Sequence, residues 1–226
     1  MKALLLLGLF LGCLSLALAA PAAKEKFTCV DLKAKFNHKL GQKAGIDAKD
    51  GNELPLKAGE QTFEGITFQI SGDIIQLGSK IRTDDPEKVE GIKIGKTFDK
   101  LHIVQATCYG GGPNVAGTSS YLEDGTEIGE YKVHYDDKSV ETIPIAYGVD
   151  VRDWWFREDE KGPSRAKVAW KGENEASKKF DCGVRLYLMT WKNPKPDTKV
   201  VSIDFIGNKE KTVVAPFCMA MTLEEE

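Results

Sequence analysis

Short runs in which apolar and polar residues alternate recur along most of this chain, and no other feature constrains its fold as strongly. An alternation with a period of two places every second side chain on the same face of a β-strand. About ten such runs occur, separated by turn-forming residues at intervals of roughly 8–12 residues, and no long amphipathic helical pattern accompanies them. The sequence therefore predicts an all-β fold, an antiparallel β-sandwich with about ten short strands and little helix.

The alternation is clearest in the segment 130–155. Tyr131, Val133 and Tyr135 lie on one face of the first run, and residues 136–138 make a polar break typical of a hairpin turn. The returning run places Ile143, Ile145 and Tyr147 on one face. Pro144 lies within the returning run and cannot donate a ladder hydrogen bond, so we expect this strand at a sheet edge or a bulge. A loop that ends on two adjacent tryptophans follows.

Three other segments are interpreted from the same pattern. The run from Thr62 to Ile70 alternates and predicts a strand, whereas residues 172–179 are polar and predict a loop. The run Val184–Trp191 carries bulky side chains on both faces, which predicts a strand in the middle of a sheet. Arg185 and Tyr187 share one face of it, which either lines a shallow groove or is covered by the partner sheet with Arg185 paired to an acid.

The first residues of the chain have the features of a cleaved signal peptide. Lys2 precedes an apolar run over residues 3–18, and Ala17-Leu18-Ala19 matches the small-x-small pattern that signal peptidase reads. The run is shorter than the about 20 apolar residues of a spanning helix, so we expect cleavage after Ala19 rather than a membrane anchor. The mature protein would then be exported to the periplasm, the cell surface or the extracellular space, with no membrane span.

Cleavage would leave a chain of about 207 residues, which suits one domain. We expect residues 20–26 to form a polar linker, residues 27–223 a single domain, and residues 224–226 a frayed acidic tail. Loss of Lys2 leaves 30 basic against 34 acidic side chains, so the formal net charge changes from −3 to −4. This charge, together with the lack of a basic patch interleaved with aromatic residues in the sequence, argues against a nucleic-acid partner.

Four cysteines remain after cleavage, namely Cys29, Cys108, Cys182 and Cys218. An even number in an exported chain is compatible with two disulfides in any of three connectivities. Because the first and last strands of a sandwich are often neighbours, Cys29–Cys218 is the preferred pair, with Cys108–Cys182 as the second. Buried free thiols are the alternative.

Several short sequence motifs occur in a characteristic order between Phe27 and Leu223. The most specific are Asp153-Trp154-Trp155 and Trp191-x-Asn193-Pro194, and others include Ala169-Trp170-x-Gly172-x-Asn174 and Ser202-Ile203-Asp204-Phe205. In this order they resemble exported bacterial modules of the galactose-binding-like β-jelly-roll type, which occur alone or appended to glycoside hydrolases and other envelope proteins. The resemblance implies a jelly roll and glycan binding, and it implies no particular set of ligand residues.

The residues that we expect to bind a glycan are Arg152, Asp153, Trp154, Trp155, Asn174 and Arg185. An aromatic ring in a loop offers a flat platform to the apolar face of a sugar, and Asp, Asn and Arg side chains bind its hydroxyls. Because Trp154 and Trp155 are adjacent, their rings should point in different directions, and at most one is expected to be exposed. Alternatively, one tryptophan fills the core and Asp153 accepts hydrogen bonds from nearby backbone amides.

A structural calcium ion is a further expectation. Asp136, Asp137 and Asp150 lie near turns and offer the oxygen ligands that calcium prefers. The sequence lacks the D-x-D-x-D-G spacing of an EF-hand, so the prediction depends on these side chains meeting in space.

Motifs typical of catalytic sites are missing from the sequence. It contains no HExxH and no G-x-S-x-G, and the segment Gly91–Thr97 is one residue short of a P-loop. We therefore expect an exported, non-catalytic carbohydrate-binding module with no cofactor. Two alternatives stay open: an interaction domain for another envelope protein, and a glycoside hydrolase-like enzyme whose carboxylate pair the sequence cannot assign.

Overall fold

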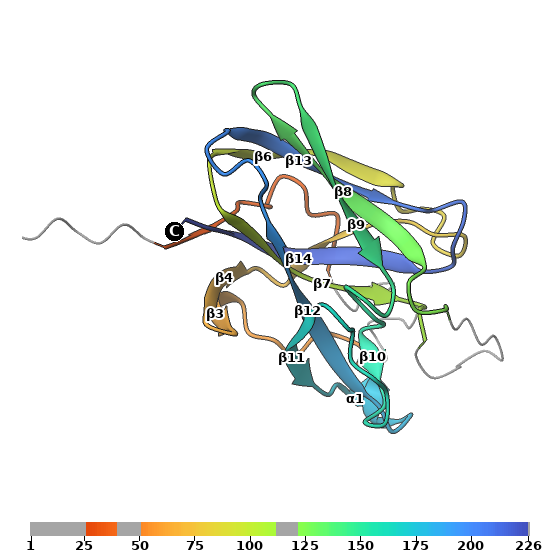
Figure 1. Cartoon of the computed structure of the whole chain (residues 1–226). Helices are drawn as coiled ribbons and strands as arrows, with labels where there is room; N and C mark the ends of the chain where they lie inside the picture. Colours follow the sequence, from red (N-terminus) through yellow and green to blue (C-terminus); the bar gives the residue numbers. More distant parts are fainter. Residues whose placement is uncertain (1–25, 40–50, 112–121, 226) are drawn as a thin grey trace, which may run out of the picture.

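The computed structural model of this chain describes residues 26–39, 51–111 and 122–225 (Figure 1). The predicted signal peptide and all but the last residue of the predicted linker lie outside the described residues. The described part is almost entirely antiparallel β-structure, which confirms the predicted all-β sandwich. None of the helices in these ranges is long and apolar enough to cross a membrane.

The larger sheet contains eight strands, in which β10, β12, β7, β14, β5 and β2 are successive neighbours, β1 pairs with β14, and β11 pairs with β12. Their bounds are β1 Phe27–Cys29, β2 His38–Lys39, β5 Asp73–Gln76, β7 Lys100–Cys108, β10 Trp155–Phe156, β11 Lys167–Gly172, β12 Gly183–Lys192 and β14 Ala215–Glu224. The predicted central strand is β12, which has β7 and β10 along one side and β11 along the other.

The second sheet has four strands in the order β6, β13, β8, β9. Their bounds are β6 Lys88–Lys96, β13 Val200–Gly207, β8 Glu127–Tyr135 and β9 Val140–Ala146. The predicted hairpin is the β8–β9 pair, and Pro144 lies in the edge strand β9 as expected. The apolar residues of both sheets form one buried cluster, in which the rings of Tyr131 and Phe205 stack at 4.6 Å.

A separate hairpin replaces the strand predicted from Thr62 to Ile70. Strands β3 (Gly59–Phe63) and β4 (Ile66–Ile70) pair with each other across a two-residue turn at Glu64 and Gly65. Both turn residues have positive φ angles, 52° and 79°, which is the geometry of the tight turns that match the twist of a hairpin. Gly65, which interrupts the alternation in the sequence, is therefore one of the two residues of the turn.

The predicted disulfides are wrong, because all four cysteines that the structure describes are free. Cys29 lies opposite Thr222 in the β1–β14 pair, four residues along β14 from Cys218. Four residues of strand span about 13 Å, which exceeds the roughly 7 Å limit between the Cα atoms of a disulfide. Cys108 and Cys182 are also too far apart for a disulfide, because the segment 153–156 lies between the strand ends that carry them.

The predicted frayed tail is also wrong for Glu224, which belongs to β14 and is buried. Its carboxylate contacts Lys26 Nζ at 2.9 Å, Lys100 Nζ at 3.3 Å and His102 Nε2 at 2.8 Å. The backbone amide of Glu225 donates to the carbonyl of Lys26 at 3.0 Å. The two ends of the described chain are therefore joined to each other.

Candidate functional site

The segment Asp153–Phe156, which contains the predicted aromatic platform, lies between two strands of the larger sheet. The β7–β12 ladder runs from Lys100 and Lys192 to Gln105 and Tyr187, and beyond that point the strands separate. Backbone hydrogen bonds then join Trp154 to both strands. Its amide donates to the Thr107 carbonyl at 2.9 Å, and its carbonyl accepts from the Arg185 amide at 2.7 Å. The segment is a wedge that completes the sheet.

Both tryptophans of this wedge are buried, with only 2% of Trp154 and 5% of Trp155 exposed. Their rings meet each other edge to face at 6.4 Å. Neither ring has a free face for a sugar, so neither can serve as the stacking platform that we expected of one of them. The reason is the wedge itself, since a segment inserted between two central strands faces the core on one side and covering loops on the other.

Asp153 has the structural role that was the alternative to ligand binding. It is buried, and its carboxylate accepts hydrogen bonds from the amides of Gly110 at 2.6 Å and Trp155 at 2.9 Å. Burial raises the pKa of this carboxyl to about 6, although the two amides oppose the shift. Its backbone carbonyl accepts from the Tyr187 hydroxyl at 3.1 Å. All these contacts hold the wedge in place.

The two predicted arginines also make internal contacts. Arg152 donates from Nη2 to the Asp124 carboxylate at 2.6 Å, and its guanidinium lies 5.5 Å from the centre of the Tyr147 ring. Arg185 is buried and donates from Nη2 to the Glu160 carboxylate at 2.8 Å, so this arginine is paired to an acid, as the alternative interpretation required. Asp153 and Arg185 both contact Tyr187, and these internal contacts stabilise the fold.

Asn174 is the one predicted ligand residue that borders a hollow. It caps the short helix α1 (Glu175–Lys178), where its Oδ1 accepts from the Ser177 amide at 2.7 Å. Its Nδ2 donates to Asn52 Oδ1 and to the Glu53 carbonyl, both at 3.1 Å. The side chain therefore fixes the geometry of the hollow and has little bonding capacity left for a ligand.

The loop 51–53 is held against α1 and the wedge. The Ala176 amide donates to the Gly51 carbonyl at 3.1 Å, and Trp155 Nε1 donates to Asn52 Oδ1 at 3.1 Å. Gly51 has a φ of 74°, and a Cβ at this position would lie 2.6 Å from the Cβ of Glu175. Only glycine allows this approach, which brings the loop and the helix together as two walls of the hollow.

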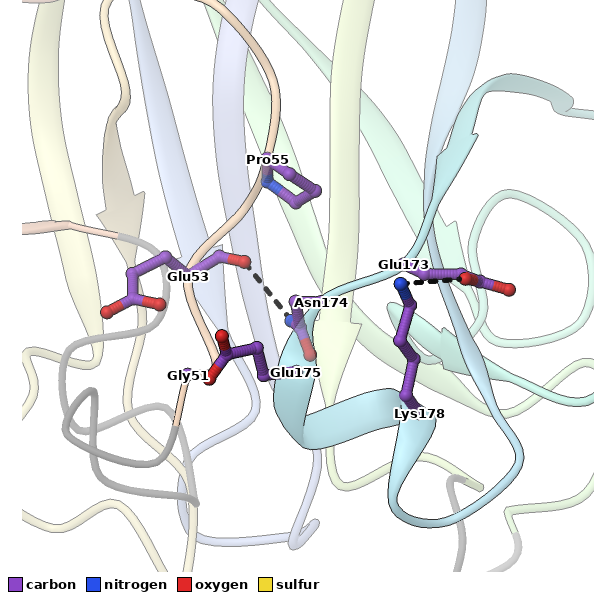
Figure 2. A pocket seen from close by; sticks show the side chains of 7 residues that line it. All are labelled: Gly51, Glu53, Pro55, Glu173, Asn174, Glu175 and Lys178. Carbon is purple, nitrogen blue, oxygen red and sulfur yellow. Dashed lines mark hydrogen bonds and ion pairs between the residues drawn. The ribbon is translucent and has the colours of Figure 1, made fainter.

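The hollow has a volume of about 620 Å³ and is open to solvent. It is lined by Gly51, Glu53, Pro55, Glu173, Asn174, Glu175 and Lys178. Figure 2 shows Glu53 and Glu175 on one side of Asn174, and Glu173 with Lys178 on the other. Figure 1 places α1 at the end of the molecule that also carries β10 and β11.

The hollow has an acidic lining. Lys178 Nζ contacts the Glu173 carboxylate at 3.4 Å, whereas Glu53 and Glu175 form no ion pair with any residue that the structure describes. These two carboxylates are free to accept hydrogen bonds from the hydroxyl or amino groups of a ligand, and Lys178 can donate. The hollow therefore offers both acceptors and a donor.

Two aromatic rings with exposed surface come from the same part of the chain. Phe180, two residues after Lys178, is 37% exposed, and its ring lies 5.8 Å from that of Trp155. Trp170 on β11 is half-buried, and its ring covers Gly172, where a Cβ would lie 2.3 Å from it. The buried Trp155 therefore supports an exposed ring instead of presenting its own.

The predicted calcium ligands do not meet. Asp137 lies before β9 and accepts from the Ser139 amide at 2.8 Å, whereas Asp150 follows β9 and binds the Arg165 guanidinium at 2.6 and 2.8 Å. The length of β9 separates them. Among the described residues, no three His, Cys, Asp or Glu side chains are arranged to hold a metal ion.

The acidic residues of the hollow do not stand out in the sequence. Glu53, Glu173 and Glu175 are 3 of 34 acidic residues, and nothing in the sequence separates them from the rest. One signal was present, because Asn174 with Ser177 three residues later is typical of a helix N-terminus. That pattern could have placed a helix in the segment predicted to be a loop.

Comparisons of the chain with protein-family models, with curated proteins and with solved structures return no match. The resemblance to galactose-binding-like modules therefore stays a prediction from the sequence.

Proposed function

We propose that this protein is an exported, non-catalytic carbohydrate-binding module of the jelly-roll type, and that its glycan binds in the hollow beside α1. The observation that carries the proposal is the open hollow of about 620 Å³ with two carboxylates that have no ion-pair partner among the described residues. The resemblance of the sequence to galactose-binding-like modules supports the same function, and the signal-peptide pattern supports export.

The chemistry of the hollow suits a hydroxyl-rich ligand. Glu53 and Glu175 accept from sugar hydroxyls, and Lys178 donates to a ring or hydroxyl oxygen. Phe180 does not line the hollow, but its exposed ring packs on Trp155, which bonds Asn52 in the loop beside the hollow, so we expect Phe180, rather than either residue of the tryptophan pair, to supply the stacking ring. A sugar held between these groups exchanges its bonds to water for bonds to charged side chains, each worth roughly 1.5–3 kcal/mol.

Binding to a broad glycan panel, with the mature protein, tests this proposal. We expect Glu175→Gln to weaken binding to the best glycan about tenfold, because one charged acceptor becomes neutral. Phe180→Ala should weaken it by a similar or larger factor through loss of stacking. Glu127→Gln, on β8 of the other sheet, is the matched control and should bind like the parent protein.

Loss of affinity in the Glu175 and Phe180 variants at an unchanged melting temperature would support the hollow as the site. A glycan that binds all three variants equally would place the site elsewhere. The same panel, assayed for new reducing ends, distinguishes binding from hydrolysis, because a hydrolase would release product that disappears in Glu53→Gln or Glu175→Gln.

A further inference from the structure

Two cations lie side by side on the face of the sheet next to the wedge. Lys171 on β11 is directly opposite Arg185 on β12 in the strand register. Both cationic groups lie over the ring of Phe156, with Lys171 Nζ at 4.7 Å and Arg185 Cζ at 4.6 Å from its centre. We call these three residues the basic floor. Like charges directly opposite each other destabilise a strand pair, so the arrangement requires compensation.

The compensation comes from a short acidic segment between β10 and β11. Glu158, Asp159 and Glu160 follow one another in the sequence, and we call them the acidic strap. Glu160 binds Arg185 at 2.8 Å, and Glu158 contacts Lys171 at 3.6 Å. The strap therefore places one carboxylate on each cation of the basic floor.

The two contacts of the strap differ in strength. The side chains of Glu158 and Lys171 are 82% and 49% exposed, and ion pairs between exposed side chains contribute little to stability. Arg185 is almost fully buried, so its pair with Glu160 is the stronger contact. Lys171 is therefore available to an incoming carboxylate at small cost, while Arg185 requires that Glu160 be displaced.

Arg185 has a buried hydrogen-bond donor without a partner. Its Nε is buried and has no hydrogen-bond partner, although Glu160 binds Nη2 of the same guanidinium. A carboxylate that bonds Nε and Nη2 together makes the bidentate contact that Glu160 does not make. An external carboxylate can thus gain a hydrogen bond over the internal one that it replaces.

We infer that the basic floor is a docking site for an acidic peptide segment of a partner protein, and that the acidic strap occupies this site in the isolated chain. The strap itself shows which occupant fits, because it is a peptide whose Glu158 and Glu160 carboxylates, two residues apart, reach the two cations. This site is separate from the hollow, and the inference does not depend on glycan binding there.

The test is direct binding of a fluorescent peptide with the Glu-Asp-Glu sequence to the mature protein. The tethered strap competes at a high effective concentration, so the parent protein should bind weakly. The double variant Glu158→Gln/Glu160→Gln should bind at least tenfold more tightly, and the added change Lys171→Gln should abolish the gain. A peptide with both glutamates replaced by glutamine should not bind, and raised salt should weaken all binding.

Control variants are Glu173→Gln and Glu175→Gln, which alter the hollow alone and should leave peptide binding unchanged. Arg185→Lys keeps the charge and removes the bidentate fork, so it should lower affinity in the double variant. If the Arg185→Lys protein fails to fold, the test depends on Lys171→Gln alone, because Lys171 is exposed and its replacement should not disturb folding. The inference is overturned if the double variant binds no more tightly than the parent, or if Lys171→Gln preserves the gain. Binding of polygalacturonate without binding of the peptide would also overturn it, by identifying an acidic glycan as the occupant.

Discussion

Asp153 shows how one buried carboxylate can tie together residues that are distant in sequence. It bonds the backbone of Gly110 and of Trp155 while its own carbonyl accepts from Tyr187. These contacts connect the loop that follows β7, the wedge and β12. The carboxylate is shielded from water, and this burial raises its pKa from 3.8 to about 6.

This shift makes the stability of the protein depend on pH in a defined direction. The folded state binds a proton at Asp153 below about pH 6, whereas the unfolded state does so only below about 4. Between these values the folded state holds more protons, so stability from this group rises as pH falls. We expect the unfolding free energy of the parent protein minus that of Asp153→Asn to increase by about 2 kcal/mol from pH 8 to pH 4.

Urea denaturation at a series of pH values measures this difference. His102, whose pKa is lowered by burial, acts in the opposite direction, but it is common to both proteins and cancels. Thr107→Val, a non-titrating change beside the wedge, is the control and should shift stability by the same amount at every pH. A constant difference for Asp153→Asn would show that the carboxylate stays ionised.

At the scale of elements, the wedge Asp153–Phe156 decides where β7 and β12 part. It also supports the hollow, because Trp155 bonds Asn52 in the loop that forms one wall. The basic floor begins at the same segment, with the ring of Phe156. One four-residue insertion into the sheet thus underlies both proposed sites.

Removal of the wedge's central ring should therefore destabilise the whole fold. We expect Trp154→Ala to lower the free energy of unfolding by about 3–5 kcal/mol, the usual result of deleting a fully buried tryptophan. Trp191→Ala is the matched control, because this ring is only half-buried and packs edge to face on Phe98 at 6.5 Å, and it should lose less than half as much. If chemical denaturation gave equal losses of unfolding free energy for the two variants, the wedge would contribute no more to stability than a half-buried ring elsewhere.

The elements that the sequence predicted well are those that follow one period without interruption. The β8–β9 hairpin and the central strand β12 follow directly from alternation and bulk. Alternation cannot show that residues 153–156 insert between strands formed by residues far away in the sequence. It also missed α1, since a single capped turn of four residues is too short to show a helical period.

The candidate site was less predictable than the fold, and for a different reason. Asn174 was identified, but the hollow owes its shape to Gly51, which permits contact between segments more than 120 residues apart. The charges of Glu53 and Glu175 became informative only once that contact placed them together. The basic floor likewise depends on the strand register, which sets Lys171 beside Arg185.

At the scale of the whole molecule, an ionic cluster closes the fold where its ends meet. Although burial alone would raise the pKa of Glu224, hydrogen bonds from Lys26, His102 and Lys100 lower it to about 2. The folded pKa is thus below the ordinary value of 4.5, so the stabilisation is complete above about pH 5 and is lost as pH falls towards 2.

We expect Glu224→Gln to lower the free energy of unfolding by about 2 kcal/mol at pH 7, and by progressively less as the pH is reduced towards 2. Glu64→Gln is the control, because its ion pair with Lys167 is solvent-exposed and should contribute less than about 1 kcal/mol. Thermal unfolding at pH 7, 4 and 2.5 gives both values. An effect of Glu224→Gln that does not change with pH would assign its role to packing rather than charge.

The meeting of the two ends of the described chain has a mechanical consequence. Lys26 and Glu225 are joined by a backbone hydrogen bond, and β1 runs antiparallel to β14 from that point. A pulling force applied to the two ends therefore loads the β1–β14 hydrogen bonds one at a time, as a zipper opens, instead of shearing them together. The first element to yield under tension is the three-residue strand β1, far from the wedge and from both proposed binding sites.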